Sequence, residues 1–373
     1  MGRPNQRVHL CFVSPEAFPI LANSDLRRSF GGAAIHQTLL AKAFRKRGFR
    51  VSVVVNDYGQ KNREVYDGIE VVTCELRHHL RKFSYFCIDT LRLICTLRRV
   101  NADIYFLMNP RTLMFTLAIN KWLSGRKIVN LVGEDVACTK DRKGFPELLY
   151  DWGLRWVDYT IFQSNFQKRC AERFLGLRGE VIRNPAHAWH SNSPPSTRDI
   201  DVLWIGLCAE TKHPHYLLDI ALAMDKVNFT MIATPTSDEE AYRSVRIRAQ
   251  SLANVTHLRC VQYKEIWRYY KRAKVFAFTS SREGFPNVFL QAWQAAAPVV
   301  SLGCDPDGII RDHKLGLVSG DICQMKKHIY LLLHNDELRA EYGKNGMDYV
   351  KRNHNMDDIC RSYMAVFDRL LER

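Results

Sequence analysis

Glu283 and Gln291 are the two side chains whose types and spacing most clearly indicate chemistry. Glu283 lies in the loop after a predicted buried strand that ends at Ser280, and Gln291 lies about one turn inside the next predicted helix. In open α/β sheets, ligands bind where strands end and loops lead into helix N-termini. The unpaired backbone amides of such a helix start attract an anion, and a diphosphate suits them. The residues predicted to form this anion site are Gly284, Phe285, Pro286, Asn287 and Val288.

The alternative interpretation of the same segment is an ordinary strand–loop–helix unit in which Glu283 is a solvated turn residue.

A parallel sheet must position these residues, and the whole chain has the pattern of such sheets. Short β-rich runs alternate with helical patterns, which is typical of parallel sheets with helices on both faces. The strand Val8–Val13, the helix Ala33–Arg47 and the strand Arg50–Val55 are predicted to form one βαβ unit. The other strands predicted in the first half are Glu70–Thr73, Ile104–Met108, Lys127–Leu131, Tyr159–Phe162 and Glu180–Ile182. Those predicted in the second half are Asp201–Ile205, Phe229–Ala233, Val255–Leu258, Val275–Thr279, Val299–Leu302 and Gly316–Ser319.

Chain length and one segment of unusual composition indicate two domains. A chain of 373 residues is too long for one ordinary open α/β core. Residues 186–198 are poor in aliphatic side chains and rich in Ser and Pro, which predicts a linker. We therefore predict two doubly wound, Rossmann-like domains facing a cleft. Their bounds are 1–186 and 200–354, with the linker at 187–199 and an amphipathic helix, Met356–Leu371, in the final segment 355–373.

The charge of the chain calls for an anionic partner. The net charge is +15, and much of the excess lies in the first half of the chain. The basic segments are Arg3–Arg7, Arg27–Arg28, Lys42–Arg50, Arg77–Lys82 and Arg92–Arg99. We exclude nucleic acid as a partner because the sequence has no recognisable nucleic-acid-binding module. Phosphorylated substrates and an anionic membrane surface remain.

The segment Glu75–Arg99 bears on the membrane question because it mixes arginines with aromatic and aliphatic residues. A basic helix with an apolar face can lie in a lipid interface. The alternative is a helix that packs on the sheet and leaves its arginines in solvent. No apolar run approaches the roughly 20 residues that span a bilayer, and Val8–Val13 is too short for a signal-peptide core. We predict a cytoplasmic protein that is peripheral on the cytoplasmic face of the membrane, with its scattered cysteines reduced.

The segment Val275–Ser301 resembles the motif of two glutamates separated by seven residues in glycosyltransferase family 4, whose members are retaining enzymes of the GT-B fold. In that family the first Glu lies against the donor sugar and the second bonds the nucleotide ribose. The resemblance therefore implies a catalytic role for Glu283 and a ribose contact for Gln291, whose amide can donate and accept hydrogen bonds. It also makes the anion site above a donor-binding site.

Three further segments support the resemblance. Residues 201–214 resemble the family's phosphate-binding strand and loop, with Lys212 as the phosphate-binding lysine but Leu207 in place of an arginine. Gly31 and Gly32 resemble the family's first glycine-rich loop, whose backbone approaches the donor or acceptor closely.

The third segment is residues 127–135, where many members place a histidine close to the transferred sugar. Here Glu134 and Asp135 follow the predicted strand. We predict that Asp135 orients a hydroxyl or assists proton removal, with capping of the next helix as the alternative. His36, inside the helix after the two glycines, is predicted to be structural. The resemblance runs from Val8 to the final helix and implies that this helix crosses back to the first domain.

Asp305-Pro306-Asp307 supports a rival interpretation, since Asp-x-Asp is the metal and nucleotide motif of GT-A glycosyltransferases. Two carboxylates could hold Mn²⁺ or Mg²⁺. The two-half architecture opposes a single GT-A domain, so we predict that the protein uses no metal or other cofactor.

The resemblance implies retaining transfer of a hexosyl unit from a UDP- or GDP-sugar to a glycan or lipid-linked acceptor, in cell-surface polysaccharide or glycolipid biosynthesis. Lys212 and the helix start would stabilise the leaving diphosphate. Two alternatives stay open. One is another nucleotide-sugar enzyme on the same fold, such as a 2-epimerase. The other is a non-catalytic nucleotide-sugar-binding homologue, which Leu207 and Gln291 make conceivable.

Overall fold

The computed structural model describes residues 8–23, 31–76, 83–108, 111–139, 144–187, 197–236, 238–280 and 283–372. The chain divides into two compact units, which are described separately. Of the described residues, those up to Pro185 and those from Met356 onward form unit 1, and those from Ala186 to Asn355 form unit 2. The predicted basic segments 3–7, 27–28 and 77–82, and residues 188–196 of the predicted linker, lie outside the described residues.

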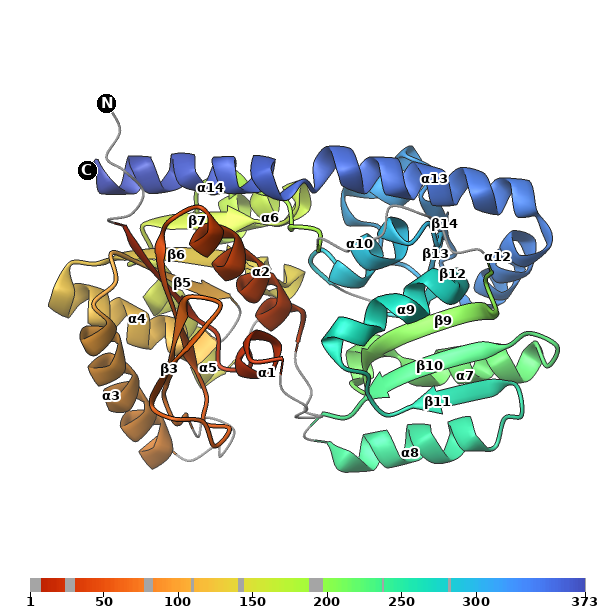
Figure 1. Cartoon of the computed structure of the whole chain (residues 1–373), viewed down its shortest axis with the longest axis horizontal. Helices are drawn as coiled ribbons and strands as arrows, with labels where there is room; N and C mark the ends of the chain where they lie inside the picture. The colour runs from red at the N-terminus through yellow and green to blue at the C-terminus, as the bar shows by residue number, and fades with distance from the viewer. Residues whose placement is uncertain are drawn as a thin grey trace. The chain divides into compact units, whose positions relative to one another are not determined.

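Unit 1 is built on an eight-stranded sheet in the order β3-β4-β2-β1-β5-β6-β7-β8 (Figure 1). Its pairings are parallel except for β3 with β4, which is antiparallel. β3 is not among the strands predicted from the sequence, because Arg-Glu-Val-Tyr contains no apolar run. Its side chains are exposed or half-buried. The strands are β1 (His9–Val13), β2 (Arg50–Val55), β3 (Arg63–Tyr66), β4 (Ile69–Thr73), β5 (Ile104–Met108), β6 (Lys127–Val132), β7 (Tyr159–Phe162) and β8 (Gly179–Val181).

Helices cover both faces of this sheet. One face packs against α1 (Phe18–Leu21), α2 (Gly32–Lys46) and α14 (Met356–Leu371). The other face packs against α3 (Phe83–Val100), α4 (Arg111–Ser124), α5 (Phe145–Leu154) and α6 (Asn165–Leu175). Among the described residues, no helix is both long enough and apolar enough to cross a membrane.

The final helix, α14, belongs to unit 1, which confirms the predicted crossover. It is amphipathic, and its apolar side is buried in the unit 1 core. The ring of Phe367 is 5.2 Å from that of Phe44 on α2 and 5.5 Å from that of Phe106 on β5, measured between centroids. The C-terminal end of the chain therefore completes the hydrophobic core formed by its N-terminal half.

Unit 2 is a second Rossmann-like unit with a fully parallel six-stranded sheet in the order β11-β10-β9-β12-β13-β14. Its strands are β9 (Ile200–Leu207), β10 (Phe229–Thr234), β11 (Val255–Leu258), β12 (Ala273–Phe278), β13 (Val299–Ser301) and β14 (Gly316–Val318). One face packs against α9 (Ile266–Arg272), α10 (Asn287–Gln294), α11 (Ile309–Asp312) and α13 (Asp336–Asn353). The other packs against α7 (Pro214–Ala223), α8 (Glu239–Gln250) and α12 (Ile322–His334).

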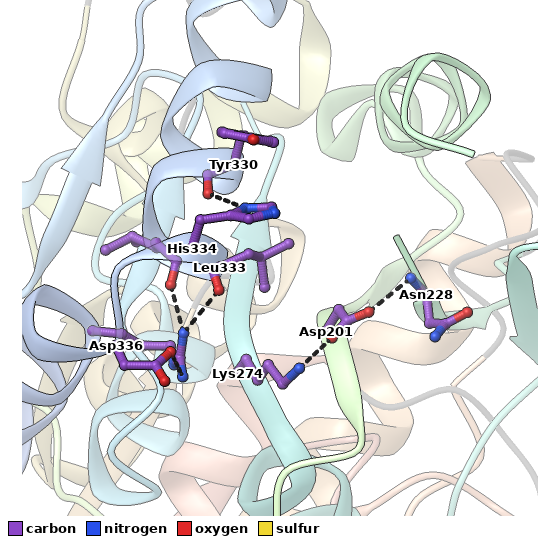
Figure 2. Close-up of polar contacts among 9 residues, drawn as sticks. Asp201, Asn228, Lys274, Tyr330, Leu333, His334 and Asp336 are labelled. Carbon is purple, nitrogen blue, oxygen red and sulfur yellow. Dashed lines mark hydrogen bonds and ion pairs between the residues drawn. The ribbon is translucent and has the colours of Figure 1, made fainter. Parts of the chain in front are cut away.

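Asp201, on β9, contacts residues at or next to both neighbouring strands, β10 and β12, near the edge of the sheet where these strands begin. Its carboxylate accepts a hydrogen bond from the Asn228 amide, just before β10, at 3.0 Å. It also pairs with Lys274 Nζ on β12 at 2.7 Å (Figure 2). Arg198, near the end of the predicted linker, is likewise fixed, since its guanidinium donates to the carbonyls of Ala295 and Ala296 at 2.6 and 3.2 Å. These contacts hold the amino-terminal edge of the sheet and leave the opposite edge to the longer loops.

Candidate functional site

Lys212 and Glu283 form an ion pair at the carboxyl-terminal edge of the unit 2 sheet. Lys212 ends the short 3₁₀ turn η3 (Glu210–Lys212) after β9, and Glu283 lies in the loop after β12. Because β9 and β12 are neighbouring parallel strands, their following loops emerge at the same edge. Lys212 Nζ contacts Glu283 Oε1, and the two side chains keep 25% and 16% of their surface exposed. Nζ can thus meet an incoming anion while the carboxylate accepts from a hydroxyl.

A buried hydrogen-bond chain fixes the backbone that carries Lys212. Thr279 Oγ1 donates to the Lys212 carbonyl at 2.6 Å and accepts from Trp204 Nε1 at 2.9 Å. Thr279 is fully buried and Trp204 nearly so. One hydroxyl therefore joins β9, the end of β12 and η3. This role of Thr279 cannot be read from the sequence, where the only signal for it is a hydroxyl residue at the end of a predicted strand.

The helix that follows Glu283 begins without a side-chain cap. α10 starts at Asn287, and Pro286 occupies its N-cap position. Proline offers no side-chain acceptor to the amides of the first turn, which include that of Val288. Gly284 and Phe285 are buried, and the Phe285 ring lies 5.1 Å from that of His354, measured between centroids. The loop between Glu283 and α10 is thus packed into unit 2.

Gln291 lies in the second turn of α10 and is 6% exposed. Its side-chain carbonyl Oε1 accepts a hydrogen bond from the Tyr270 hydroxyl on α9 at 2.8 Å. Burial raises the pKa of Tyr270 far above its usual value, so the phenol remains a donor. This bond fixes the orientation of the amide and directs its NH₂ group, a donor only, away from Tyr270. The sequence alone does not identify Tyr270 as a partner of Gln291, because the two residues belong to different helices.

Asp305, from the predicted Asp-x-Asp motif, has a local structural role. Its Oδ1 accepts from the Ile310 amide at 2.8 Å, and its Oδ2 pairs with Arg311 at 3.3 Å. Burial raises the pKa of Asp305 above its usual value. Asp307 lies in the adjoining turn at φ 51°. No cluster of three or more His, Cys, Asp or Glu side chains suited to a metal occurs in the part of the chain that the structure describes.

In unit 1, Gly31 and Gly32 lie at the start of α2. The Gly31 amide donates to Glu16 Oε2 at 3.0 Å, so a carboxylate already faces this helix start. Gly31 has φ −81° and ψ 166°, an extended conformation that any residue adopts. A Cβ added there would lie 3.5 Å from Glu16 Oε2, an ordinary contact. The described protein atoms therefore give no steric reason for glycine at position 31.

Asp135 and Glu134 also lie in unit 1, after β6. Asp135 begins the 3₁₀ turn η2 (Asp135–Cys138), and Glu134 is its exposed N-cap residue. Capping of the next helix, the predicted alternative role, is not seen for Glu134, because its side chain makes no capping hydrogen bond to η2. η2 packs against α6, which carries Cys170. The pKa of Cys170 is raised mainly by burial and further by the negative charge of Asp135. Asp135 therefore lies in a different unit from Lys212 and Glu283.

Comparison with solved structures identifies the fold. Sucrose-phosphate synthase from Thermosynechococcus elongatus matches with a TM-score of 0.80 at 15% identity, covering 98% of this chain and 100% of that one. The HepE protein of Anabaena, solved with UDP and glucose, matches with a TM-score of 0.73 at 14% identity, covering 97% and 100%. TarM of S. aureus, solved with fondaparinux, α-GlcNAc-glycerol and UDP, matches with a TM-score of 0.62 at 15% identity, covering 75% and 59%.

These matches and the two Rossmann-like units define the GT-B fold of glycosyltransferases, as predicted. The family follows from two models that match consecutive parts of the chain. The model described as glycosyltransferase family 4 matches residues 30–187, and the model described as glycosyl transferases group 1 matches residues 187–348. The chain belongs to the group 1 glycosyltransferases of family 4, and it is a glycosyltransferase. A sequence search of curated proteins found no match.

Proposed function

We propose that this glycosyltransferase moves a hexosyl unit from a UDP- or GDP-sugar to a hydroxyl of a glycan or lipid-linked acceptor, with retention at the anomeric carbon. The observation that carries the proposal is the Lys212–Glu283 ion pair in the loops that lead to the start of α10, where the N-cap residue is Pro286. A diphosphate suits the cation and the helix start, and a sugar hydroxyl suits the carboxylate. The UDP complexes of HepE and TarM support a nucleotide-sugar donor.

In the proposed reaction, the bond between the anomeric carbon and the leaving diphosphate breaks as the acceptor oxygen bonds to that carbon. Negative charge develops on the diphosphate, and Lys212 Nζ and the amides near Asn287 and Val288 stabilise it. Leu207, at the end of β9, supplies no charge, and among the described residues we assign the role of phosphate-binding cation to Lys212. Glu283 binds the donor sugar, and Gln291 donates its NH₂ group to the ribose.

The residues of unit 1 complete the proposal. Asp135 orients the hydroxyl that reacts or takes its proton, and the backbone of Gly31 and Gly32 allows close approach of donor or acceptor. Such an approach would give glycine a role at half-buried position 31, where the described protein atoms do not require it.

The donor is tested by a thermal-shift screen against UDP, GDP and their common sugars, because a ligand of the folded state raises the apparent stability. Turnover with the best donor is then measured with and without glycan and lipid-linked acceptors. NMR of the product reports the anomeric configuration, and the donor's configuration in the product supports retention. Turnover without acceptor would instead indicate a 2-epimerase, and a thermal shift without any turnover would indicate a binding homologue.

We further propose that turnover needs no divalent cation, because Lys212 and the α10 amides supply the positive charge. The carboxylate of Asp305 is engaged by Ile310 and Arg311. We expect the initial rate in excess EDTA to equal the rate in Mg²⁺ or Mn²⁺. A rate abolished by EDTA and restored by Mn²⁺ would contradict this.

The pathway and place of action are also proposals. We propose that the enzyme serves cell-surface polysaccharide or glycolipid biosynthesis, and that it works in the cytoplasm at the cytoplasmic face of the membrane. The net charge of +15 supports the membrane location, and the complex of TarM with fondaparinux and α-GlcNAc-glycerol supports a glycan acceptor.

A further inference from the structure

Helix α5 of unit 1 turns an apolar stripe toward solvent. Phe145, Leu148 and Trp152 are spaced along one side of the helix, and Trp156 follows one turn later. Their exposed fractions are 53%, 68%, 38% and 37%. The opposite side of α5 packs into the unit 1 core. A surface helix normally turns only one stripe of apolar residues inward, so this second stripe indicates a binding surface.

The stripe continues onto the two neighbouring helices of the same face. The ring of Phe115 on α4 lies 5.1 Å from that of Trp152, and the ring of Phe86 on α3 lies 6.3 Å from that of Phe145, measured between centroids. α4 packs against both α3 and α5 (Figure 1). We call the combined surface the aromatic face. Its exposed members are Phe145, Leu148, Trp152 and Trp156, and its half-buried members are Phe86 and Phe115.

The concentration of these residues is unusual within the chain. Of the fifteen large hydrophobic side chains that are exposed in the described residues, four belong to the aromatic face, on or directly after one helix. Those of unit 2, such as Leu222, Ile247 and Tyr330, lie on separate helices. Single exposed apolar residues need no explanation, whereas a group that includes two tryptophans in ring contact does.

The exposed charges of these three helices are positive. Arg92, Arg98 and Arg99 on α3 and Arg155 after α5 are exposed. Arg92 pairs with Glu75, whereas the ion pairs among the described residues leave Arg98, Arg99 and Arg155 without a carboxylate. The acidic residues of the same helices are not exposed. They are Asp89 and Glu147, which are buried, and Asp151, which is half-buried.

We propose that the aromatic face docks on the surface of an anionic lipid bilayer. Tryptophan and phenylalanine rings are favoured at the level of the lipid headgroups, and arginines beside them are attracted by anionic lipids. Pairing with a second copy of the chain would bring like charges together without facing carboxylates, which disfavours that occupant. The proposal goes beyond the reaction, since the surface is the same whichever donor the enzyme uses.

Co-sedimentation with lipid vesicles tests the proposal on the full chain. We expect binding to vesicles of phosphatidylcholine mixed with phosphatidylglycerol, and little binding to pure phosphatidylcholine. The double substitution Phe145→Ser with Leu148→Ser, both at strongly exposed positions on α5, lowers the partition constant by about tenfold or more. The matched control is Leu222→Ser with Tyr330→Ser in unit 2, which leaves the partition constant unchanged.

A charge series completes the test. Arg98→Gln with Arg155→Gln lowers binding to the anionic vesicles by about fivefold for each arginine. The control Arg243→Gln with Arg246→Gln, on the exposed side of α8 in unit 2, has a smaller effect. Nucleotide-induced thermal shifts equal to those of the unchanged protein show that each variant is folded, and they separate this proposal from the proposed reaction.

Three results would overturn the proposal. The first is no binding to anionic vesicles, and the second is equal binding by the Phe145→Ser, Leu148→Ser variant. The third is a lipid-free dimer, detected by sedimentation, that this variant abolishes, since the aromatic face would then bind a second copy.

Discussion

Among single residues, Thr279 is the one that most supports the candidate site, although its hydroxyl contacts no ligand in the proposed reaction. It satisfies the buried indole N–H of Trp204 and holds the Lys212 carbonyl. Thr279→Val keeps the shape of the side chain but leaves Trp204 Nε1 without its acceptor. We expect the free energy of unfolding to fall by about 1–3 kcal/mol. We also expect weaker donor binding, since the backbone of Lys212 is no longer fixed. Urea denaturation and donor titration measure the two effects.

Thr230→Val is the matched control for this substitution. Thr230 is also buried in the unit 2 sheet, on β10, at 8% exposure. It should change neither donor affinity nor stability by a comparable amount. If Thr279→Val binds donor as tightly as Thr230→Val, then Thr279 does not position Lys212.

Helix α14 shows at the scale of elements how the end of the chain stabilises unit 1. Phe367 is 1% exposed and contacts aromatic rings on α2 and β5. We expect Phe367→Ala to lower the free energy of unfolding by about 3–5 kcal/mol, because it leaves a cavity in the core. Leu371→Ala, at a position 41% exposed on the same helix, should cost far less. Chemical denaturation of the two variants checks this, and equal losses would contradict the packing described for α14.

Elements with continuous apolar runs could be predicted from the sequence. β2, β5 and β7 have the predicted bounds, because strands buried on both faces carry mostly apolar and β-branched side chains. The edge strand β3 could not be predicted, since its polar residues satisfy no such pattern. The same limit applies to the site. The local motif identified Glu283 and Lys212 separately, but their contact depends on the pairing of β9 with β12. The roles of Thr279 and Tyr270 depend on partners distant in sequence.

At the scale of the whole molecule, two buried histidines make stability depend on pH. Burial lowers the pKa of His36 on α2 to about 4, and burial with the charge of Arg50 lowers the pKa of His9 to about 4. An unfolded chain takes up these protons near pH 6.5. The unfolded state therefore binds more protons below that pH, and stability falls as the pH drops from about 6.5 toward 4. His36, predicted to be structural, is fully buried, and it accounts for about 3 kcal/mol of this loss.

Denaturation between pH 7.5 and pH 4 measures this dependence. His36→Gln should flatten the profile on the acid side, because the amide does not titrate, whereas the exposed His334→Gln should leave the slope unchanged. An unaltered slope in His36→Gln would show that other groups cause the loss of stability.

We propose above all that Lys212 and Glu283 form the donor site at the carboxyl-terminal edge of the unit 2 sheet. Lys274 provides a matched control, since it also pairs with a carboxylate, Asp201, but at the opposite edge of the sheet (Figure 2). Donor affinity and transfer rate should be compared in Lys212→Met and Lys274→Met. We predict a loss of about 100-fold or more in the transfer rate of Lys212→Met, with Lys274→Met close to the unchanged enzyme. Equal rates and donor affinities in the two variants would contradict the claim.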